Sequence, residues 1–345
     1  MAYTTIDNPG LFFNTVLYSG NGSTQSITGV GFQPDWIWQK ERSSTSYHVA
    51  TDAVRGNTKQ LFPNDPYGDV TDSNYITSFD SDGFGQGANN DTNQSSQTYV
   101  AWNWKANGSG SSNSDGSITS TVSANTTAGF SIVSYTGTGS NATVGHGLGV
   151  APKVLILKSR TRNDGQWSVG SDMLGWTKFL YLDANSAAQT FNIYQDTAPT
   201  SSVFSLSSDG GVNQSGGNMI GYAFAEKKGY SRFGSYTGNG STDGTFVYTG
   251  FRPAWVITKI TSGADSWTLW DNTRDPHNVA TSMLRADTAQ VEDTSSSYLV
   301  DFLSNGFKWR ASDGKQNGSG SSYIFMAFAE APFVTAGTKA AGTAR

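Results

Sequence analysis

The sequence of 345 residues is 36% hydrophobic and 13% aromatic, carries a formal net charge of −5 and contains no cysteine. An acidic chain without a cluster of Lys and Arg offers no concentrated positive surface for phosphates, which excludes nucleic acid as an expected partner. The lack of Cys excludes disulfides, thiol catalysis and Cys-based zinc sites. No apolar run approaches the ~20 residues that cross a bilayer, and the first residues lack the basic and apolar regions of a secretory signal, so neither membrane insertion nor export is expected.

Abundant Gly, Ser, Thr, Asn and Asp favour an all-β chain of short strands joined by turns. Several sequence patterns recur in the same order, which indicates internal repeats. They are a strand that ends in a Gly-rich turn, an apolar strand that follows Pro and ends in Lys, a further turn, and an aromatic closing strand. The copies are LYSGNGS, SYTGTGS and SYTGNGS; QPDWIWQK, APKVLILK and RPAWVITK; SFDSDGF, SLSSDGG and DFLSNGF; and YVAWNWKA, MIGYAFAE and YIFMAFAE.

These patterns predict three tandem antiparallel β-sandwich repeats of the jelly-roll or lectin-like type. The repeats span residues 1–106, 128–228 and 229–333. The Gly/Ser/Thr-rich segment 107–127 is expected to be a linker. Residues 334–345 contain no large apolar residue except Val334, so we expect this tail to dock on a neighbouring subunit.

The strand that follows Pro is the best-defined element of each predicted repeat. Both of its faces are apolar, which is typical of a central strand covered on both sides. Pro cannot donate to a ladder, so it is expected to mark the beginning of the strand. Gly-containing dipeptides in the preceding pattern are expected to supply positive φ in tight hairpin turns. They are Asn21-Gly22, Thr138-Gly139 and Asn239-Gly240.

Few residues have the types and spacing that catalysis or metal binding requires. His48, His146 and His277 fall at non-equivalent positions without a partner at metal or triad spacing, and His146 is expected to bond to backbone. The sequence DSDG at 80–83 lacks the spaced ligand series of a calcium loop and is expected to be a turn. We therefore predict no catalytic residue, no metal ligand and no cofactor, and we name no ligand-binding residue.

Carboxylates are the other candidates for chemistry. Glu226 and Glu330 are equivalent by repeat, but no pair of carboxylates stands out as the facing pair that a glycosidase needs. Each repeat also has an Asp after the Lys-ended strand, and we expect Lys and Asp to meet at one edge of the sheet as a structural pair. The pairs are Lys40 with Asp52, Lys158 with Asp172, and Lys259 with Asp271.

The aromatic residues of the closing strand allow two interpretations. A stripe of aromatic side chains can be a sugar-stacking platform or part of a core. Recurrence at equivalent strand positions favours the core. The residues are Trp102, Trp104, Tyr222, Phe224 and Phe328.

The combination of YSGNGSTQSITGVGFQPDWIWQKERSS, YVAWNWKANGS, YTGTGSNATVGHGLGVAPKVLILKSR and a closing AFAEAPF resembles the repeat-containing tail-fibre or structural proteins of aquatic tailed bacteriophages. The resemblance covers nearly the whole chain. It implies a virion protein with lectin-like sandwich modules, assembled in the host cytoplasm and located on the tail or capsid surface. It implies no catalytic residue.

The resemblance favours a non-enzymatic tail-fibre or tail-tip adhesin that contacts a glycan or receptor of the host. Expected partners are other copies of the chain, in a homo-oligomer such as a trimer, and other virion proteins. Contact is expected through the loops that differ most among the repeats, 41–74, 159–202 and 260–297. Tyr67, Trp176 and Trp270 are possible contacts there, but each is expected to be packed rather than exposed. The alternatives are a capsid-decorating or baseplate protein and a polysaccharide depolymerase, which would need paired carboxylates in one repeat.

Overall fold

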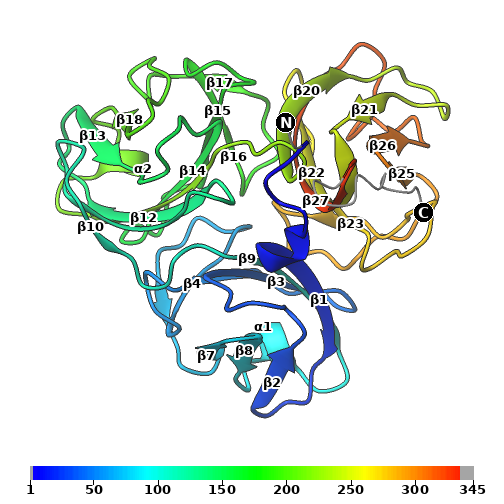
Figure 1. Ribbon diagram of the computed structural model, residues 1–345, viewed down its shortest axis with the longest axis horizontal. Helices are drawn as coiled ribbons and strands as arrows, with labels where there is room; N and C mark the ends of the chain where they lie inside the picture. The colour runs from blue at the N-terminus through cyan, green and yellow to red at the C-terminus, as the bar shows by residue number, and fades with distance from the viewer. Residues whose placement is uncertain (1–2, 335–345) are drawn as a thin grey trace.

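The computed structural model describes residues 3–334, and their regular structure is almost entirely antiparallel β-sheet, as the sequence predicts. In Figure 1 the chain forms three lobes around a common centre, coloured from blue to cyan, in green, and from yellow to red along the chain. We call these lobes sandwich 1, sandwich 2 and sandwich 3. None of the helices in the part of the chain that the structure describes is long and apolar enough to cross a membrane.

The elements of each sandwich follow one another in the chain. Sandwich 1 contains η1 (Pro9–Leu11), β1 (Phe13–Ser19), β2 (Gln25–Thr28), β3 (Trp36–Glu41), β4 (His48–Asp52), β5 (Lys59–Leu61), β6 (Val70–Thr71), β7 (Ile76–Asp80), β8 (Gly83–Gln86), α1 (Asn90–Asn93) and β9 (Thr98–Trp104). Sandwich 2 contains β10 (Ser111–Asn113), β11 (Ser120–Asn125), β12 (Phe130–Thr136), β13 (Ala142–Gly145), β14 (Val154–Ser159), β15 (Ser168–Ser171), β16 (Lys178–Tyr181), β17 (Gln189–Thr190), β18 (Val203–Leu206), α2 (Gly210–Asn213) and β19 (Asn218–Phe224). Sandwich 3 contains β20 (Ser231–Thr237), β21 (Phe246–Tyr248), β22 (Phe251–Ile260), β23 (Thr268–Asp271), β24 (Leu284–Arg285), β25 (Val300–Leu303), β26 (Gly306–Trp309) and β27 (Ser322–Pro332).

Each sandwich has a large sheet and a small sheet, and the large sheets share an order of five strands, with further strands at the edges of the first two. The large sheets run β1-β9-β3-β4-β5-β6, β10-β11-β12-β19-β14-β15-β16-β17 and β20-β27-β22-β23-β24. The small sheets are β2-β8-β7, β13-β18 and β21-β26-β25. The Lys-ended strands β3, β14 and β22 therefore have a neighbour on each side, as predicted for central strands.

The two apolar faces of the central strand pack against different partners. Ile37 of β3 belongs with Phe84 of the small sheet to the core of sandwich 1. The neighbouring Trp36 points the other way and stacks on Tyr222 of sandwich 2, with ring centroids 4.4 Å apart. Since successive side chains of a strand alternate between faces, the second apolar face is explained by packing between sandwiches.

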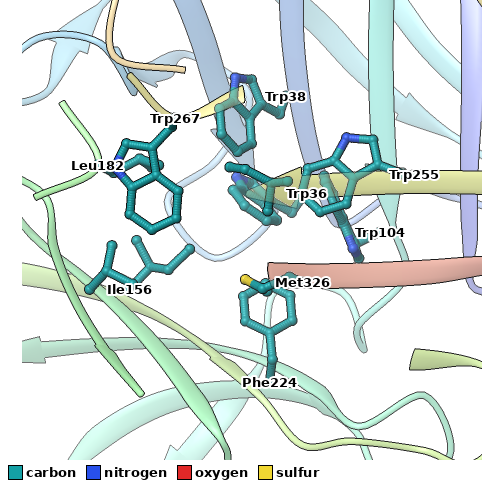
Figure 2. A pocket seen from close by; sticks show the side chains of 11 residues that line it. Trp36, Trp38, Trp104, Ile156, Leu182, Phe224, Trp255, Trp267 and Met326 are labelled. Carbon is teal, nitrogen blue, oxygen red and sulfur yellow. The ribbon is translucent and has the colours of Figure 1, made fainter. Parts of the chain in front are cut away.

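The three large sheets meet in one central apolar core. Figure 2 shows side chains from all three sandwiches converging there: Trp36, Trp38, Trp104, Ile156, Leu182, Phe224, Trp255, Trp267 and Met326. The space left among them is about 10 Å³, roughly the room for one water molecule, and its lining is apolar. The aromatic closing strands thus form core, as expected, and burial of each large side chain contributes about 2–3 kcal/mol.

Two expectations about strand boundaries are corrected in part. Pro34 and Pro152 precede β3 and β14, but Pro253 lies inside β22, where the register shifts on either side of it. Such a bulge lets Pro occur within a strand without a ladder bond. SFDSDGF and DFLSNGF each contain the turn between two paired strands of a small sheet, whereas SLSSDGG leads from β18 into α2.

The Gly residues of the dipeptides have positive φ, as predicted, but the prediction that they lie in hairpin turns is wrong. Gly22, Gly139 and Gly240 have φ of 70°, 69° and 66°. Each lies in a loop that leads from the large sheet to the small sheet, because β1 pairs with β9 while β2 pairs with β8.

The prediction that residues 107–127 form a linker is also wrong. This segment contains β10 and β11, and β11 pairs along its whole length with β12, from Ser120 opposite Tyr135 to Asn125 opposite Phe130. A strand with one exposed face tolerates hydroxyl side chains, so a composition rich in Ser and Thr does not distinguish it from a linker. The predicted tail at 334–345 lies, apart from Val334, outside the described residues.

Candidate functional site

A ring of hydrogen bonds joins the three sandwiches at equivalent positions. The indole Nε1 of Trp167 donates to the carbonyl of Phe62 in sandwich 1 at 2.8 Å, and Trp267 Nε1 donates to the carbonyl of Tyr181 in sandwich 2 at 2.8 Å. His48 completes the ring, because its Nε2 lies 2.9 Å from the carbonyl of Arg285 in sandwich 3. Each sandwich therefore contacts both of the others.

His48 has a structural role in this ring. Its Nδ1 accepts a hydrogen bond from Trp38 Nε1 at 2.9 Å, so its Nε2 carries the proton that is donated to Arg285. Burial, aided by the charge of Lys40, holds the pKa of His48 well below its ordinary value. Both ring nitrogens of His48 are thus engaged in hydrogen bonds within the protein.

Two of the three junctions carry a carboxylate between two arginines. Asp69 binds Arg55 of its own sandwich at 3.0 Å and Arg160 of sandwich 2 at 2.7 Å. At the junction of sandwiches 3 and 1, Glu292 binds Arg274 at 2.8 Å and Arg42 at 2.7 Å. Burial raises the pKa of Glu292, but both guanidinium groups act in the opposite direction and hold it below its ordinary value.

The predicted pairing of Lys with Asp is wrong. Antiparallel register places Lys40 opposite His48 and Asp52 opposite Trp36, at the two ends of the same pair of strands. Asp52 binds Arg55 at 2.5 Å and accepts from the hydroxyl of Tyr222 at 2.8 Å. Asp271 likewise binds Arg274, and Asp172 accepts from the indole of Trp176.

The three lysines instead donate to backbone carbonyls in buried positions. Lys158 Nζ lies 2.7 Å from the carbonyl of Pro66 in sandwich 1, and Lys259 Nζ lies 3.1 Å from that of Asn185 in sandwich 2. Lys40 donates to the carbonyl of Glu41 at 2.6 Å. Burial lowers the pKa of each of these lysines to about 8.

The remaining sequence candidates lie in separate places. His146 is buried, with Nε2 3.2 Å from the carbonyl of Thr200, so the prediction that it bonds to backbone is confirmed, while His277 is exposed. Residues 80–83 form the turn between β7 and β8. Glu226 and Glu330 bind Arg232 and Arg252 respectively. Among the residues that the structure describes, no group of three or more His, Cys, Asp or Glu is placed to hold a metal ion.

Of the three aromatic candidate contacts, one is exposed. Tyr67 is 53% exposed, whereas Trp176 and Trp270 are buried. The indole of Trp176 is held by Asp172, and Trp270 packs against Trp309 in the core of sandwich 3.

The variable loops lie largely at the junctions between sandwiches. Ser46 N donates to the carbonyl of Ala289 at 3.0 Å, and Ala188 N donates to that of Thr261 at 3.2 Å. The loops differ in sequence partly because each fits a different neighbour. Sequence alone did not reveal this constraint, since the neighbour is set by the arrangement of the sandwiches.

A polar groove at the junction of sandwiches 3 and 1 is the candidate functional site. It has a volume of about 710 Å³. We call it the junction groove, and it is lined by Thr45, Arg285, Gln290, Val291, Glu292, Asp293, Thr294 and Ser295. Both contributing loops, 41–74 and 260–297, were predicted as contact surfaces.

The charged groups of the junction groove are held in place by one another. Arg285 donates to Gln290 Oε1 at 2.8 Å and to Asp293 Oδ2 at 2.8 Å, and its guanidinium lies 5.6 Å from the ring centroid of Tyr298. Burial raises the pKa of Asp293, but backbone and side-chain bonds from Ser295 and the contact with Arg285 hold it below its ordinary value. The groove thus presents ordered guanidinium, amide, carboxylate and hydroxyl groups, which can donate to and accept from the hydroxyls of a bound sugar.

A recurring buried asparagine escaped the sequence analysis. Asn93, Asn213 and Asn317 are fully buried, and each side-chain oxygen accepts from the backbone of the preceding Gly-rich loop, at Asn21, Thr138 and Asn239. These asparagines recur at a fixed distance before the closing strand, and this recurrence could have identified them from the sequence.

The described chain is an all-β protein of three antiparallel β-sandwiches, which share one apolar core and form a polar groove where the last sandwich meets the first. The chain belongs to a domain family of unknown function, DUF7483, whose profile matches residues 8–332. A comparison with curated proteins gives no match.

Proposed function

We propose that the protein is a non-enzymatic structural protein of a bacteriophage virion, a tail-fibre or tail-tip adhesin that contacts a glycan or receptor on the host surface. The resemblance of its motifs to phage tail proteins supports the virion. The observation that supports recognition is the junction groove, where Arg285, Gln290 and Asp293 form an ordered polar surface between two sandwiches.

The use of the ionisable residues supports binding over catalysis. Asp52, Asp271 and Glu292 lie in buried ion pairs with arginines that hold the sandwiches and their junctions together. For Glu292, the guanidinium groups of Arg274 and Arg42 stabilise the charged form, which does not suit the general acid of a glycosidase.

A glycan array probed with the purified protein tests the proposal. Gln290 and Gln189 are both exposed, but only Gln290 lines the junction groove, so Gln189→Ala is the matched control for Gln290→Ala. Loss of one or two hydrogen bonds predicts about 3- to 10-fold weaker binding for Gln290→Ala and unchanged binding for the control. Equal binding by both variants would show that the glycan does not bind in the junction groove.

Two further results would favour one of the alternative functions. Density for the protein repeated over the capsid lattice in cryo-electron micrographs of virions would favour the capsid-decorating alternative. Loss of capsule or lipopolysaccharide during incubation with the purified protein would contradict the non-enzymatic proposal in favour of a depolymerase.

A further inference from the structure

The large sheets of sandwiches 2 and 3 differ at one edge. Strands β12 and β20 occupy the same position, beside the closing strands β19 and β27. On its other side β12 is paired with β11, whereas β20 is the edge strand of its sheet in the described chain. In the small sheets, β13 and β21 are equivalent strands, because Val144 of β13 and Val247 of β21 each pair with a Phe of the neighbouring strand.

Residues 116–125 fill the groove between the two sheets of sandwich 2. Val122 of β11 pairs with Val133 of β12, and Ile118 forms a bridge with Val144. Ile118 N donates to the carbonyl of Thr143 at 3.0 Å. Ile118 and Val122 are both only 6% exposed, so this segment supplies main-chain bonds to both sheets and covers the core between them.

The equivalent groove of sandwich 3 is open. It has a volume of about 370 Å³, and its lining includes Gly234 and Tyr236 of β20 and Phe246, Val247 and Tyr248 of β21. Phe246 and Tyr248 are 43% and 55% exposed. An edge strand beside exposed aromatic side chains is the arrangement in which a peptide adds as a further strand, with main-chain bonds for affinity and side-chain pockets for specificity.

Sandwich 1 does not offer the same groove. β1 is also the edge strand of its sheet in the described chain, but the side chain of its Asn14 reaches the segment just after β2, where Nδ2 donates to the carbonyl of Val30 at 3.1 Å. The open position in sandwich 3 is therefore the place where a strand can pair with β20 and contact β21 at the same time.

We propose that the groove between β20 and β21 accepts an extended segment of another protein, which pairs antiparallel with β20 as β11 pairs with β12. The segment carries aliphatic side chains among Ser and Thr, since this is the chemistry of residues 116–125 on the equivalent edge. The aliphatic side chains enter the core beside Tyr236 and Val247, as Ile118 and Val122 do beside Tyr135 and Val144, and the outer face of the segment contacts Phe246 and Tyr248 at the rim of the groove. The inference concerns a protein partner and does not depend on the glycan groove.

A synthetic peptide with the sequence of residues 116–125, GSITSTVSAN, is the probe, and a scrambled peptide is its control. We expect saturable binding to the full chain, with new hydrogen-exchange protection confined to β20 and β21. The amides of β12, which already has β11 beside it, are expected to be unchanged. Phe246→Asp is expected to weaken binding about 10-fold, the loss of one well-packed contact of 1.4 kcal/mol.

Phe191→Asp is the matched control, because Phe191 is 57% exposed and lies outside this groove. It is expected to leave binding unchanged. The proposal is overturned if the scrambled peptide binds as well, if the two Asp variants weaken binding equally, or if protection falls on β1. Protection of β20 that rises with protein concentration without peptide would also overturn it, since the occupant would then be a second copy of the chain.

Discussion

The carboxylate of Glu292 lies 2.7 Å from the guanidinium of Arg42, although 250 residues separate them in the sequence. Together with Arg274, this contact fastens the last sandwich to the first and so closes the ring. The junction of sandwiches 2 and 3 has Ala188 and Thr261 at the corresponding positions and is joined there by a backbone hydrogen bond.

Replacing Glu292 by Gln should lower the free energy of unfolding by about 2 kcal/mol. The change removes a charge that two guanidinium groups share, and Arg274 is fully buried. Denaturant titration measures the effect. Asp164→Asn is the control, because Asp164 binds Arg162 on the surface and its loss should not shift the midpoint. Equal shifts for both variants would show that closure of the ring does not contribute.

Replacing Trp36 by Ala should lower the free energy of unfolding by about 3–5 kcal/mol and destabilise all three sandwiches together. Trp36 stacks on Tyr222 of sandwich 2 and lies in the core that all three sandwiches share. Hydrogen exchange should therefore show reduced protection in β14 and β22 as well as in β3. Reduced protection in β3 alone would mean that the sandwiches unfold independently.

Replacing Asp183 by Asn should flatten the pH dependence of stability between about pH 4 and pH 6. Burial raises the pKa of Asp183 from 3.8 to about 6, so in this window the folded state holds a proton that the unfolded state releases. Stability contributed by this group is present below pH 4 and falls as the pH rises to 6, by on the order of 2 kcal/mol. Denaturation of both proteins at pH 4, 5, 6 and 7 measures the difference.

Sandwich 1 supplies a natural precedent for that substitution. Asn64 Oδ1 accepts from His48 N at 2.8 Å, as Asp183 Oδ1 accepts from Trp167 N at 3.0 Å. The backbone bond should therefore survive in Asp183→Asn. A difference between the two proteins that does not change with pH would contradict the raised pKa.

Replacing Asn213 by Ala should cost about 3 kcal/mol of stability. The side chain accepts from Thr138 N at 2.8 Å and donates to the carbonyls of Ser140 at 2.7 Å and Ser207 at 2.8 Å, so its loss removes three bonds, leaves a cavity and leaves the buried carbonyl of Ser207 without this donor. Thermal unfolding measures the loss. Asn141→Ala, at an exposed position nearby, should change little, and similar losses for both would argue against the role of the buried amide.

The prediction of the candidate site from sequence was partial, and particular residues show why. His146 bonds to nearby backbone, and the loops on either side of the junction groove were named in advance. The pairing of Lys40 with Asp52 failed because strand register places them at opposite ends of β3 and β4. Trp176 is packed, as expected, and its indole binds Asp172, whereas Tyr67 is exposed.

The sequence by itself determined the all-β class, the central Lys-ended strands and the aromatic closing strands. These features depend on local alternation, turn chemistry and repetition, which are visible along the chain. Only the tertiary structure decided that the second apolar face of each large sheet packs against the other sandwiches, that Glu292 reaches Arg42, and that residues 116–125 cover one edge while its equivalent stays open. Those relationships join residues far apart in the chain, and their geometry follows from how whole sheets pack, which no local pattern encodes.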